Sequence, residues 1–333
     1  MRFDDKYWYR PDLTVTTGLL LPLSWLFSVI ASLRRTFYKF NLIKTHRFNI
    51  PVIVVGNITA GGTGKTPCVI ALANFLKANG YSPGVVTRGY GGKECSIPFA
   101  VNADTSADDA GDEAVLIARN TNCPLVVCVS RVAAADMLIR EFPDCNVIIS
   151  DDGLQHYALS RDVEIIVIDG TRKFGNGRML PAGPLREPIS RLKQADFVVV
   201  NGGMPDIDEV MTIVNNDLIS LSADENNDSA ALKMKKIHAV AGIGNPSKFF
   251  NILRGYGYDI IEHAFPDHYR FTESDLNFGD DLPIVMTEKD AVKCEKFADE
   301  RMWYLPASAT FSGQFLQNVS RKLKEINRVS TVN

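Results

Sequence analysis

The chain has 333 residues, of which 46% are hydrophobic and 23% charged, and its formal net charge is −3. This composition is that of a globular protein long enough for two domains, at roughly 100–200 residues each, and it excludes a largely disordered chain. The slightly negative charge argues against a general nucleic-acid-binding protein. The six cysteines are scattered without a C-x-x-C pair, which argues against a zinc site and favours buried, reduced thiols.

Positive charge is concentrated at the N-terminal end. Residues 1–50 hold eight lysines and arginines against three acidic residues, a net charge of +5, so the remaining 283 residues carry −8. A basic end on an acidic body indicates local contact with an anionic surface.

The same end contains a run of 21 residues without charge, Leu13–Leu33. As a helix this run would be about 32 Å long, close to the hydrocarbon thickness of a bilayer. A cleavable signal peptide fits poorly, because acidic residues precede the run and no small-x-small cleavage site follows it. Three interpretations stay open: a helix that spans the membrane, a helix that lies in its interface, and a buried helix.

Residues around the run favour the interfacial position. Pro22 interrupts the apolar pattern, and Trp8, Tyr9 and Trp25 are of the kind enriched at membrane–water boundaries. Each basic residue near an anionic leaflet adds about 1 kcal/mol of attraction. We therefore predict a membrane-associated helix within residues 1–36, with residues 13–35 in contact with the membrane surface.

A phosphate-binding loop follows the first predicted strand. The apolar, β-branched run Pro51–Gly56 predicts a buried strand, and Val69–Leu76 has the apolar periodicity of a helix. Glycines between them allow backbone N–H groups to converge on phosphate oxygens, at a helix N-terminus that adds positive potential. The loop residues that we expect to bind nucleotide are Thr59, Ala60, Gly61, Gly62, Thr63, Gly64, Lys65 and Thr66.

Two side chains of this loop have expected roles. Lys65 would reach the β- and γ-phosphates, and the Thr66 hydroxyl would coordinate Mg²⁺. Thr59 stands where the common G-x-x-x-x-G-K-[ST] pattern has glycine. The sequence has no N-K-x-D motif of GTPases, and Ala60 replaces the lysine that opens the loop of partitioning ATPases. The sequence therefore lacks the diagnostic residues of both common non-kinase classes, the GTPases and the partitioning ATPases.

Acidic residues follow two further predicted strands. Asp151 and Asp152 come after Val147–Ser150, and Asp169 comes after Val163–Ile168. Adjacent carboxylates repel one another and are usually held together by a cation, so the first pair is the better candidate for Mg²⁺. A single aspartate after a strand is as often a turn residue or a helix cap.

Other charged residues lie near predicted element ends. Asp112 and Glu113 open an apolar-periodic helix, where a carboxylate can act as a general base or cap the helix. Arg88 follows a predicted strand, and Arg186 and Glu187 lie in a rigid, proline-rich loop. The residues alone assign no role to these arginines or to Glu187.

Taken together, the motifs resemble those of one family. They are VGNITAGGTGKTP, TRGYGG, AGDEAVLIAR, SDDGLQHYALSRD, IDGTRKFGNGRMLPAGPLRE, VVNGG, AVAGIGNPSKFF, PDHY and VMTEKDAVK. In this order the chain closely resembles the tetraacyldisaccharide 4′-kinases, which phosphorylate the lipid A precursor of Gram-negative bacteria. The resemblance runs from the apolar segment to about residue 306, and the DDGLQH and GNGRMLPAGPLRE blocks are more specific than the phosphate-binding loop.

The resemblance implies a role for each matching residue. Asp112 would be the catalytic base, and His268 of the PDHY motif would partner it from the second domain. The family's loop also lacks the leading glycine, so Thr59 is consistent with the resemblance. The implied catalytic residues are Asp112, His268, Lys65 and Arg186. The implied nucleotide-binding residues outside the loop are Arg88, Gln155 and His156, and the implied metal ligands are Thr66, Asp151, Asp152 and Glu187.

The resemblance also implies an α/β fold of three parts. Besides the helix within residues 1–36, we expect a P-loop NTPase-like kinase domain over residues 37–195 and a smaller α/β domain over 196–333 that closes over the cleft. The implied enzyme uses ATP and Mg²⁺ to phosphorylate the 4′-hydroxyl of the tetraacylated disaccharide 1-phosphate, giving lipid IVA. It would work at the cytoplasmic face of the inner membrane, without nucleic acid or an obligate protein partner.

Two other classes stay open on the residues alone. One is a nucleotide-switched membrane module that transfers no phosphate. The other is a P-loop kinase for a soluble metabolite, which the N-terminal apolar run disfavours. Transfer of phosphate from ATP to a lipid A disaccharide 1-phosphate would separate the three.

Overall fold

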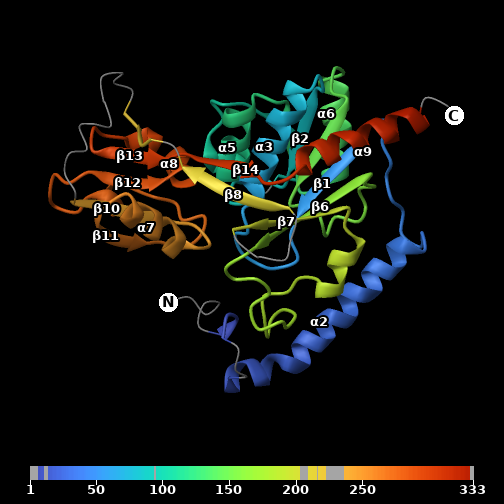
Figure 1. The fold of residues 1–333 in the computed structure, drawn as a ribbon, viewed down its shortest axis with the longest axis horizontal. Helices are drawn as coiled ribbons and strands as arrows, with labels where there is room; N and C mark the ends of the chain where they lie inside the picture. The colour runs from blue at the N-terminus through green and yellow to red at the C-terminus, as the bar shows by residue number, and fades with distance from the viewer. Residues whose placement is uncertain are drawn as a thin grey trace.

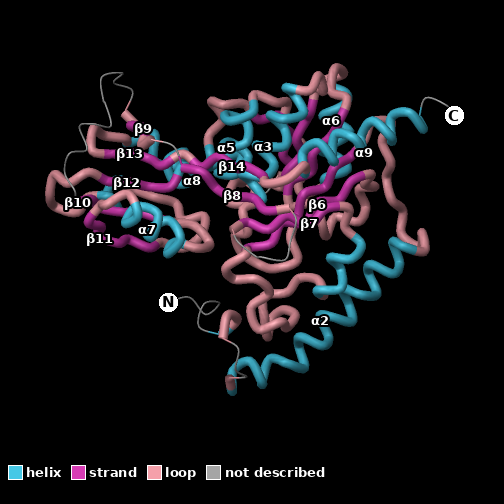
Figure 2. The backbone as a smooth tube through the Cα atoms, viewed as in Figure 1, coloured by secondary structure: helices cyan, strands magenta, loops and turns pink. Residues whose placement is uncertain are grey.

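The computed structural model describes residues 7–10, 14–93, 95–202, 209–215, 217–222 and 236–330. Within these residues the chain forms a nine-stranded sheet, a five-stranded sheet and one long helix that lies along the outside of the molecule (Figure 1). Figure 2 shows the two groups of strands side by side, with helices packed around each.

The larger sheet is mostly parallel. Its strands are β1 (Val52–Gly56), β2 (Pro83–Thr87), β3 (Phe99–Val101), β4 (Leu125–Val127), β5 (Val147–Asp151), β6 (Val163–Asp169), β7 (Phe197–Asn201), β8 (Val210–Asn215) and β14 (Ala307–Phe311). Their order is β14-β8-β7-β6-β1-β5-β2-β4-β3, and the two edge pairs, β14-β8 and β3-β4, are antiparallel. The carboxyl ends of the central strands therefore meet at one edge of the sheet, where parallel α/β folds bind ligands.

Helices cover both faces of this sheet. They are α3 (Lys65–Ala78), α4 (Ala107–Ala110), α5 (Asp112–Thr121), α6 (Arg131–Glu141) and α9 (Phe315–Ser330). Buried side chains of α3, α5 and α9 pack with Ile53 and Val55 of β1, whereas those of α6 pack with Val52 and Val54. Because both faces are covered, the central strands are mostly apolar, as their sequences predict, although β6 also contains the buried Glu164. All six cysteines are free and five are buried, also as predicted.

The smaller sheet lies in the later part of the chain. Its strands are β9 (Ile219–Ser220), β10 (Lys236–Ala241), β11 (Asp259–Ala264), β12 (Ile284–Thr287) and β13 (Met302–Leu305). They are ordered β11-β10-β12-β13-β9, and all pairs are parallel except β13-β9. The accompanying helices are α7 (Pro246–Gly255), α8 (Glu288–Cys294) and the short 3₁₀ helices η3 (Glu273–Leu276) and η4 (Glu295–Phe297). Phe249, Phe250 and Leu253 of α7 fill the core on one face.

The two sheets do not divide the chain at a single point. β7, β8 and β14 pair within the nine-stranded sheet, and α9 returns to cover it. The predicted boundary at residue 196 precedes β7, so the strand pairing places the smaller unit between residues 217 and 306 instead. The apolar run 197–200 predicts a strand but carries no sign of the sheet it joins. We call residues 217–306 the smaller unit and the nine-stranded sheet with its helices the larger unit.

The predicted apolar segment forms α2 (Val15–Lys39), and residues 1–6 and 11–13 lie outside the described residues. Within α2 the buried residues are Thr17 and Ser24, and Ser24 Oγ donates to Met179 O at 2.8 Å. Leu19 and Trp25 are 76% and 66% exposed, so the helix contacts the larger unit along a narrow stripe and is not a buried helix. By length and composition, α2 is the described helix that could cross a membrane.

Candidate active site

The phosphate-binding loop connects β1 to α3 at the carboxyl edge of the larger sheet. Gly61 and Gly64 have φ values of 98° and 94°, in the left-handed region that glycine adopts without strain. A Cβ at Gly64 would also lie 2.4 Å from Asn201 Nδ2, so this position has no room for a side chain. Because α3 begins at Lys65, its unpaired N–H groups face the loop. The loop thus has the backbone conformation that an anion-binding site requires.

A second loop, which carries Arg186 and Glu187, pairs with the phosphate-binding loop. Ala60 N donates to Pro184 O at 2.7 Å, and Arg186 N donates to Ile58 O at 2.7 Å. The two segments therefore lie side by side like short strands. This pairing positions Arg186 beside the phosphate-binding loop. The two segments are far apart in the sequence, so no local pattern predicts that they are neighbours.

Lys65, Asp152 and Arg186 form one cluster of charges at the end of β5. Lys65 Nζ lies 3.6 Å from Asp152 Oδ1, and Arg186 Nη1 lies 3.3 Å from each oxygen of the same carboxylate. Burial alone would raise the pKa of Asp152, but the two cations outweigh it and hold this pKa below its usual value. Asp152 is therefore ionised.

Asp151, which ends β5, has a different environment. It is 1% exposed, and its Oδ2 accepts from Thr87 Oγ1 at 3.2 Å, whereas its Oδ1 has no hydrogen-bond partner among the described residues. Burial, reinforced by the charges of Glu113 and Asp152, raises the pKa of Asp151 to about 7. A buried carboxylate oxygen without a hydrogen-bond donor can be satisfied by coordinating a cation, so this acidic pair fits Mg²⁺.

Glu187 is surrounded by donors. Its Oε1 accepts from Tyr157 Oη at 2.7 Å, and its Oε2 lies 3.7 Å from Arg35 Nη1 and 3.4 Å from Arg191 Nε. Arg35 belongs to α2, so the N-terminal helix is joined to the loop beside the nucleotide site. Sequence reasoning missed Arg35 and Arg191, because no local pattern relates α2 to a loop so far along the chain.

The other residues expected at the nucleotide lie around these loops. Gln155 Nε2 donates to Asn57 O at 3.1 Å, at the start of the phosphate-binding loop. Burial and the charge of Arg131 lower the pKa of His156 to about 4, so this side chain is neutral at physiological pH. Arg88 is exposed directly after β2, and its charge adds to the lowering of the His156 pKa.

Asp112 and His268 meet across the two units. Asp112 begins α5 and is 3% exposed, and His268 lies between β11 and η3. His268 Nδ1 is 2.9 Å from Asp112 Oδ1 and 3.1 Å from Oδ2. The two residues are 156 positions apart in the chain, and the resemblance alone pointed to this pair.

Lys289 of α8 sets the tautomer of His268. Its Nζ donates to Glu113 Oε1 at 2.8 Å and lies 3.3 Å from His268 Nε2. Burial opposes the charge of Lys289, but Glu113 and Asp112 raise its pKa and keep it protonated. An ammonium group can only donate, so Nε2 accepts and the imidazole proton is on Nδ1, facing Asp112.

Lys293, one turn further along α8, lies on the other side of Asp112. Its Nζ is 3.6 Å from Asp112 Oδ2 and donates to Asp290 Oδ1 at 2.6 Å. Burial would raise the pKa of Asp112, but Lys289, His268 and Lys293 together bring it below its usual value. Both lysines were missed as site residues, although their i, i+4 spacing in VMTEKDAVK places them on one helix face.

A pocket between the two units opens beside the Asp112–His268 pair. Gly91 of the larger unit and Arg270 and Phe271 of the smaller unit are among its lining residues. A polar molecule could therefore reach the carboxylate from this side.

Comparison with known proteins agrees with the geometry. The family model described as LpxK, tetraacyldisaccharide-1-P 4′-kinase, matches residues 16–324. Proteins named tetraacyldisaccharide 4′-kinase from Nitrosococcus oceani and Methylobacillus flagellatus are 48% and 46% identical to this chain, each over 98% of it and 97% of the relative.

A solved structure shows the same fold. It is the "apo" form of LpxK from Aquifex aeolicus in complex with ATP, with a TM-score of 0.77 and 27% sequence identity over 93% of this chain and 100% of that chain. The predicted α/β architecture of a P-loop kinase is confirmed. Since the family model and the relatives cover nearly the whole sequence, the chain belongs to the tetraacyldisaccharide-1-P 4′-kinase family.

Proposed function

We propose that this chain transfers the γ-phosphoryl group of ATP to the 4′-hydroxyl of the tetraacylated glucosamine disaccharide 1-phosphate, giving lipid IVA. The observation that carries the proposal is a phosphate-binding loop on the same edge of the larger unit as a buried carboxylate paired with His268. The relatives carry the name of this kinase, and the Aquifex protein is in complex with ATP.

The nucleotide would bind on the loop. Backbone N–H groups of residues 61–66 would surround the phosphates, with Lys65 and Arg186 neutralising part of their charge. Arg88, Gln155 and His156 would complete the surroundings of the nucleotide. Mg²⁺ would be held by the residues predicted for it, namely Thr66, Asp151, Asp152 and Glu187. When bound, the ion would neutralise negative charge on the β- and γ-phosphates.

The chemical step uses the Asp112–His268 pair. Asp112 accepts the proton of the 4′-hydroxyl while the sugar oxygen bonds to the γ-phosphorus and the bond to the β-phosphate oxygen breaks, releasing ADP. His268 holds the carboxylate through Nδ1–H, and Lys289 maintains that tautomer. The acceptor sugar would enter through the pocket between the units, and closure of the units would exclude water as a competing acceptor.

The proposal is tested by transfer of ³²P from labelled ATP to a lipid A disaccharide 1-phosphate. We expect label in the lipid. Release of labelled inorganic phosphate without labelled lipid would favour the nucleotide-switched module instead. Preferential labelling of a soluble sugar would favour the metabolite kinase.

Lys293→Met should shift the pH dependence of this reaction. Removal of a cation beside Asp112 favours its protonated form and raises its pKa. The base must be ionised, so activity falls as the pH drops through this pKa, and a higher pKa moves that loss to higher pH. The acidic limb of the kcat/KM profile should therefore lie at higher pH in the variant.

A matched control for this variant is Lys296→Met. Lys296 also joins the two units, but its partner at 2.7 Å is the exposed Asp108. The acidic limb of the kcat/KM profile of Lys296→Met should coincide with that of the unaltered protein. A folded Lys293→Met protein with an unmoved acidic limb would show that Lys293 does not act on Asp112.

We infer that α2 lies in the membrane interface, with the acyl chains of the substrate directed toward it. Its exposed side carries Leu19 and Leu26, and the basic residues Arg34, Arg35 and Lys39 follow in the same helix. Apolar side chains with basic residues at one end are suited to an anionic leaflet. This arrangement would hold the enzyme at the cytoplasmic face of the inner membrane.

A double substitution tests this position of α2. Leu19 and Leu26 are 76% and 56% exposed, so Leu19→Asp with Leu26→Asp removes little packing. A leucine that becomes buried in the membrane contributes about 1.5–3 kcal/mol to membrane binding. The partition of the double variant onto vesicles with anionic lipid should therefore fall at least about tenfold. Co-sedimentation measures it, with Tyr256→Asp, an exposed position on the smaller unit, as the control. Undiminished vesicle binding by the double variant would reject the interfacial helix.

A further inference from the structure

The smaller unit contacts the phosphate-binding loop at a glycine on each side. A Cβ at Gly244 would lie 2.8 Å from Gly62 N, so the two backbones approach closely. α7 begins at Pro246, two residues after Gly244. The contact is therefore made by the N-terminal end of α7, where unpaired N–H groups give positive potential.

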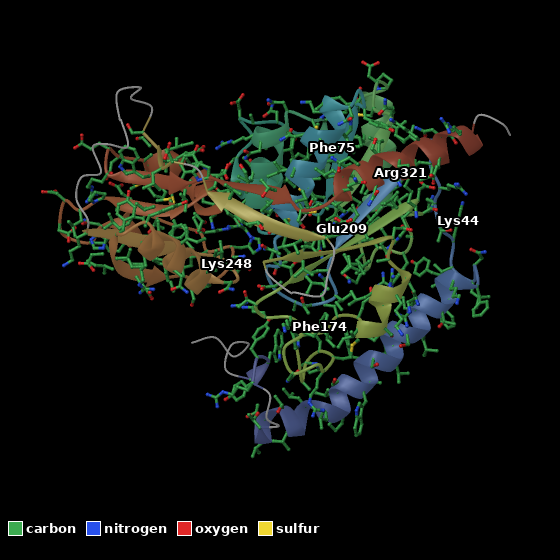
Figure 3. The ribbon with its side chains drawn as sticks, viewed as in Figure 1. Lys44, Phe75, Phe174, Glu209, Lys248 and Arg321 are labelled. Carbon is green, nitrogen blue, oxygen red and sulfur yellow. The ribbon has the colours of Figure 1, made fainter. Side chains whose placement is uncertain are left out.

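Lys248, in the first turn of α7, is linked to the loop through one side chain. Its Nζ donates to Asn201 Oδ1 at 3.1 Å, and Asn201 Nδ2 donates to Thr63 O at 3.1 Å. Asn201 is 6% exposed and packs against Gly64. Figure 3 labels Lys248 on the side of α7 that faces the larger unit. The ammonium group is thus two hydrogen bonds from the backbone on which the phosphates would lie.

The partner of Lys248 is a neutral amide. The other lysines between the units have carboxylate partners: Lys289 pairs with Glu113, Lys293 with Asp290 and Lys296 with Asp108. Among the residues that the structure describes, no acidic side chain forms an ion pair with Lys248. A hydrogen bond from an ammonium to a phosphate oxygen is stronger than one to a neutral carbonyl, so Lys248 gains by exchanging Asn201 for a phosphate.

We propose that Lys248 is a catalytic cation that the smaller unit supplies to the γ-phosphate of ATP. The ammonium group leaves the Asn201 amide, binds a γ-phosphate oxygen and offsets the charge on the phosphoryl group during transfer. In other P-loop enzymes, a cation inserted from outside the loop performs this task. His268 belongs to the same unit and already contacts Asp112 in this arrangement, so the smaller unit supplies both the cation for the phosphate and the partner of the base. This inference rests on the proposed kinase function.

The test compares Lys248→Met with Lys248→Arg. Calorimetry measures binding of ADP and of a non-hydrolysable ATP analogue, and single-turnover labelling measures transfer to lipid A disaccharide 1-phosphate. We expect Lys248→Met to lower the affinity for the ATP analogue about tenfold. The affinity for ADP should change by no more than about twofold, because ADP lacks the phosphate that Lys248 would bind. Transfer should fall roughly 10²–10³-fold, and Lys248→Arg should recover most of both properties.

Two controls separate this role from a structural one. Lys296→Met removes a lysine between the same units, and it should bind both nucleotides as the unaltered protein does. Asn201→Ala removes the present partner of Lys248 and should lower transfer less than Lys248→Met does. The proposal would be overturned if Lys248→Met lost affinity for ADP and for the analogue equally, or lost neither. It would also be overturned if Asn201→Ala reproduced the defect of Lys248→Met in full. Failure of the unaltered protein to label the lipid would instead refute the kinase function.

Discussion

Asp112→Asn should abolish nearly all phosphoryl transfer while leaving nucleotide affinity within about twofold. The amide has the shape of the carboxylate but cannot accept a proton, and general base catalysis contributes roughly 10²–10⁴-fold to rate. The carboxylate is buried and receives Nδ1–H of His268, so no solvent base can take its place in the closed arrangement. Single-turnover labelling of the lipid gives the chemical rate, and ADP titration gives the affinity.

The folded state should survive this change. Lys293 keeps its 2.6 Å bond to Asp290, and Lys289 keeps its bond to Glu113, so neither lysine is left without a carboxylate. Glu295→Gln alters an exposed acid that pairs with Arg119 across the same two units, away from the pocket beside Asp112, and should retain activity. A chemical rate for Asp112→Asn equal to that of the unaltered protein would remove Asp112 as the base.

The second large effect is expected from Lys65→Ala. A cation 4 Å from a phosphate charge contributes about 4 kcal/mol at an effective dielectric of 20, which corresponds to nearly 10³-fold in kcat/KM for ATP. The loss should persist at saturating ATP, because the charge on the phosphoryl group must also be stabilised during transfer. Steady-state kinetics over a range of ATP concentrations would measure both quantities.

The control for this variant lies on the same helix. Lys77 is in the last turn of α3 and donates to Thr121 O at 2.6 Å, away from the phosphate-binding loop. Lys77→Ala should keep wild-type kinetics. If Lys65→Ala retained more than about a tenth of the kcat/KM for ATP, the phosphates would have to bind somewhere other than this loop.

Local features of the site were predictable from the sequence, because their parts are contiguous. The strand before the loop, the glycines and the helix after it occupy residues 51–78, and each has a signal within a few positions. The acidic pair after β5 was predicted for the same reason. The uncharged run predicted a helix at this end of the chain, and the structure shows such a helix with an exposed apolar side.

Long-range relations were not predictable from physical patterns. The partner of Asp112 lies 156 residues away, and only the resemblance identified it. Arg35, Lys248 and Lys289 are ordinary surface-type residues by local criteria, and the roles proposed for them follow from the residues that the fold brings beside them. The boundary predicted at residue 196 differs from the strand pairing because β7 and β8 join the larger sheet, and β14 and α9 return to that sheet after the smaller unit.

The insertion of the smaller unit between β8 and β14 limits how it can move. Asn215 at the end of β8 pairs with Ala307 at the start of β14, so the chain enters and leaves the smaller unit at one spot on the sheet edge. The smaller unit is thus joined to the larger sheet through one antiparallel strand pair, and a rotation of the unit would bend the chain at that pair. Because Lys248 and His268 both belong to the smaller unit, a rotation of that unit would move the proposed phosphate-binding cation and the partner of the proposed base together. Half-assembled states, in which ATP could lose its phosphate to water, would then be rare.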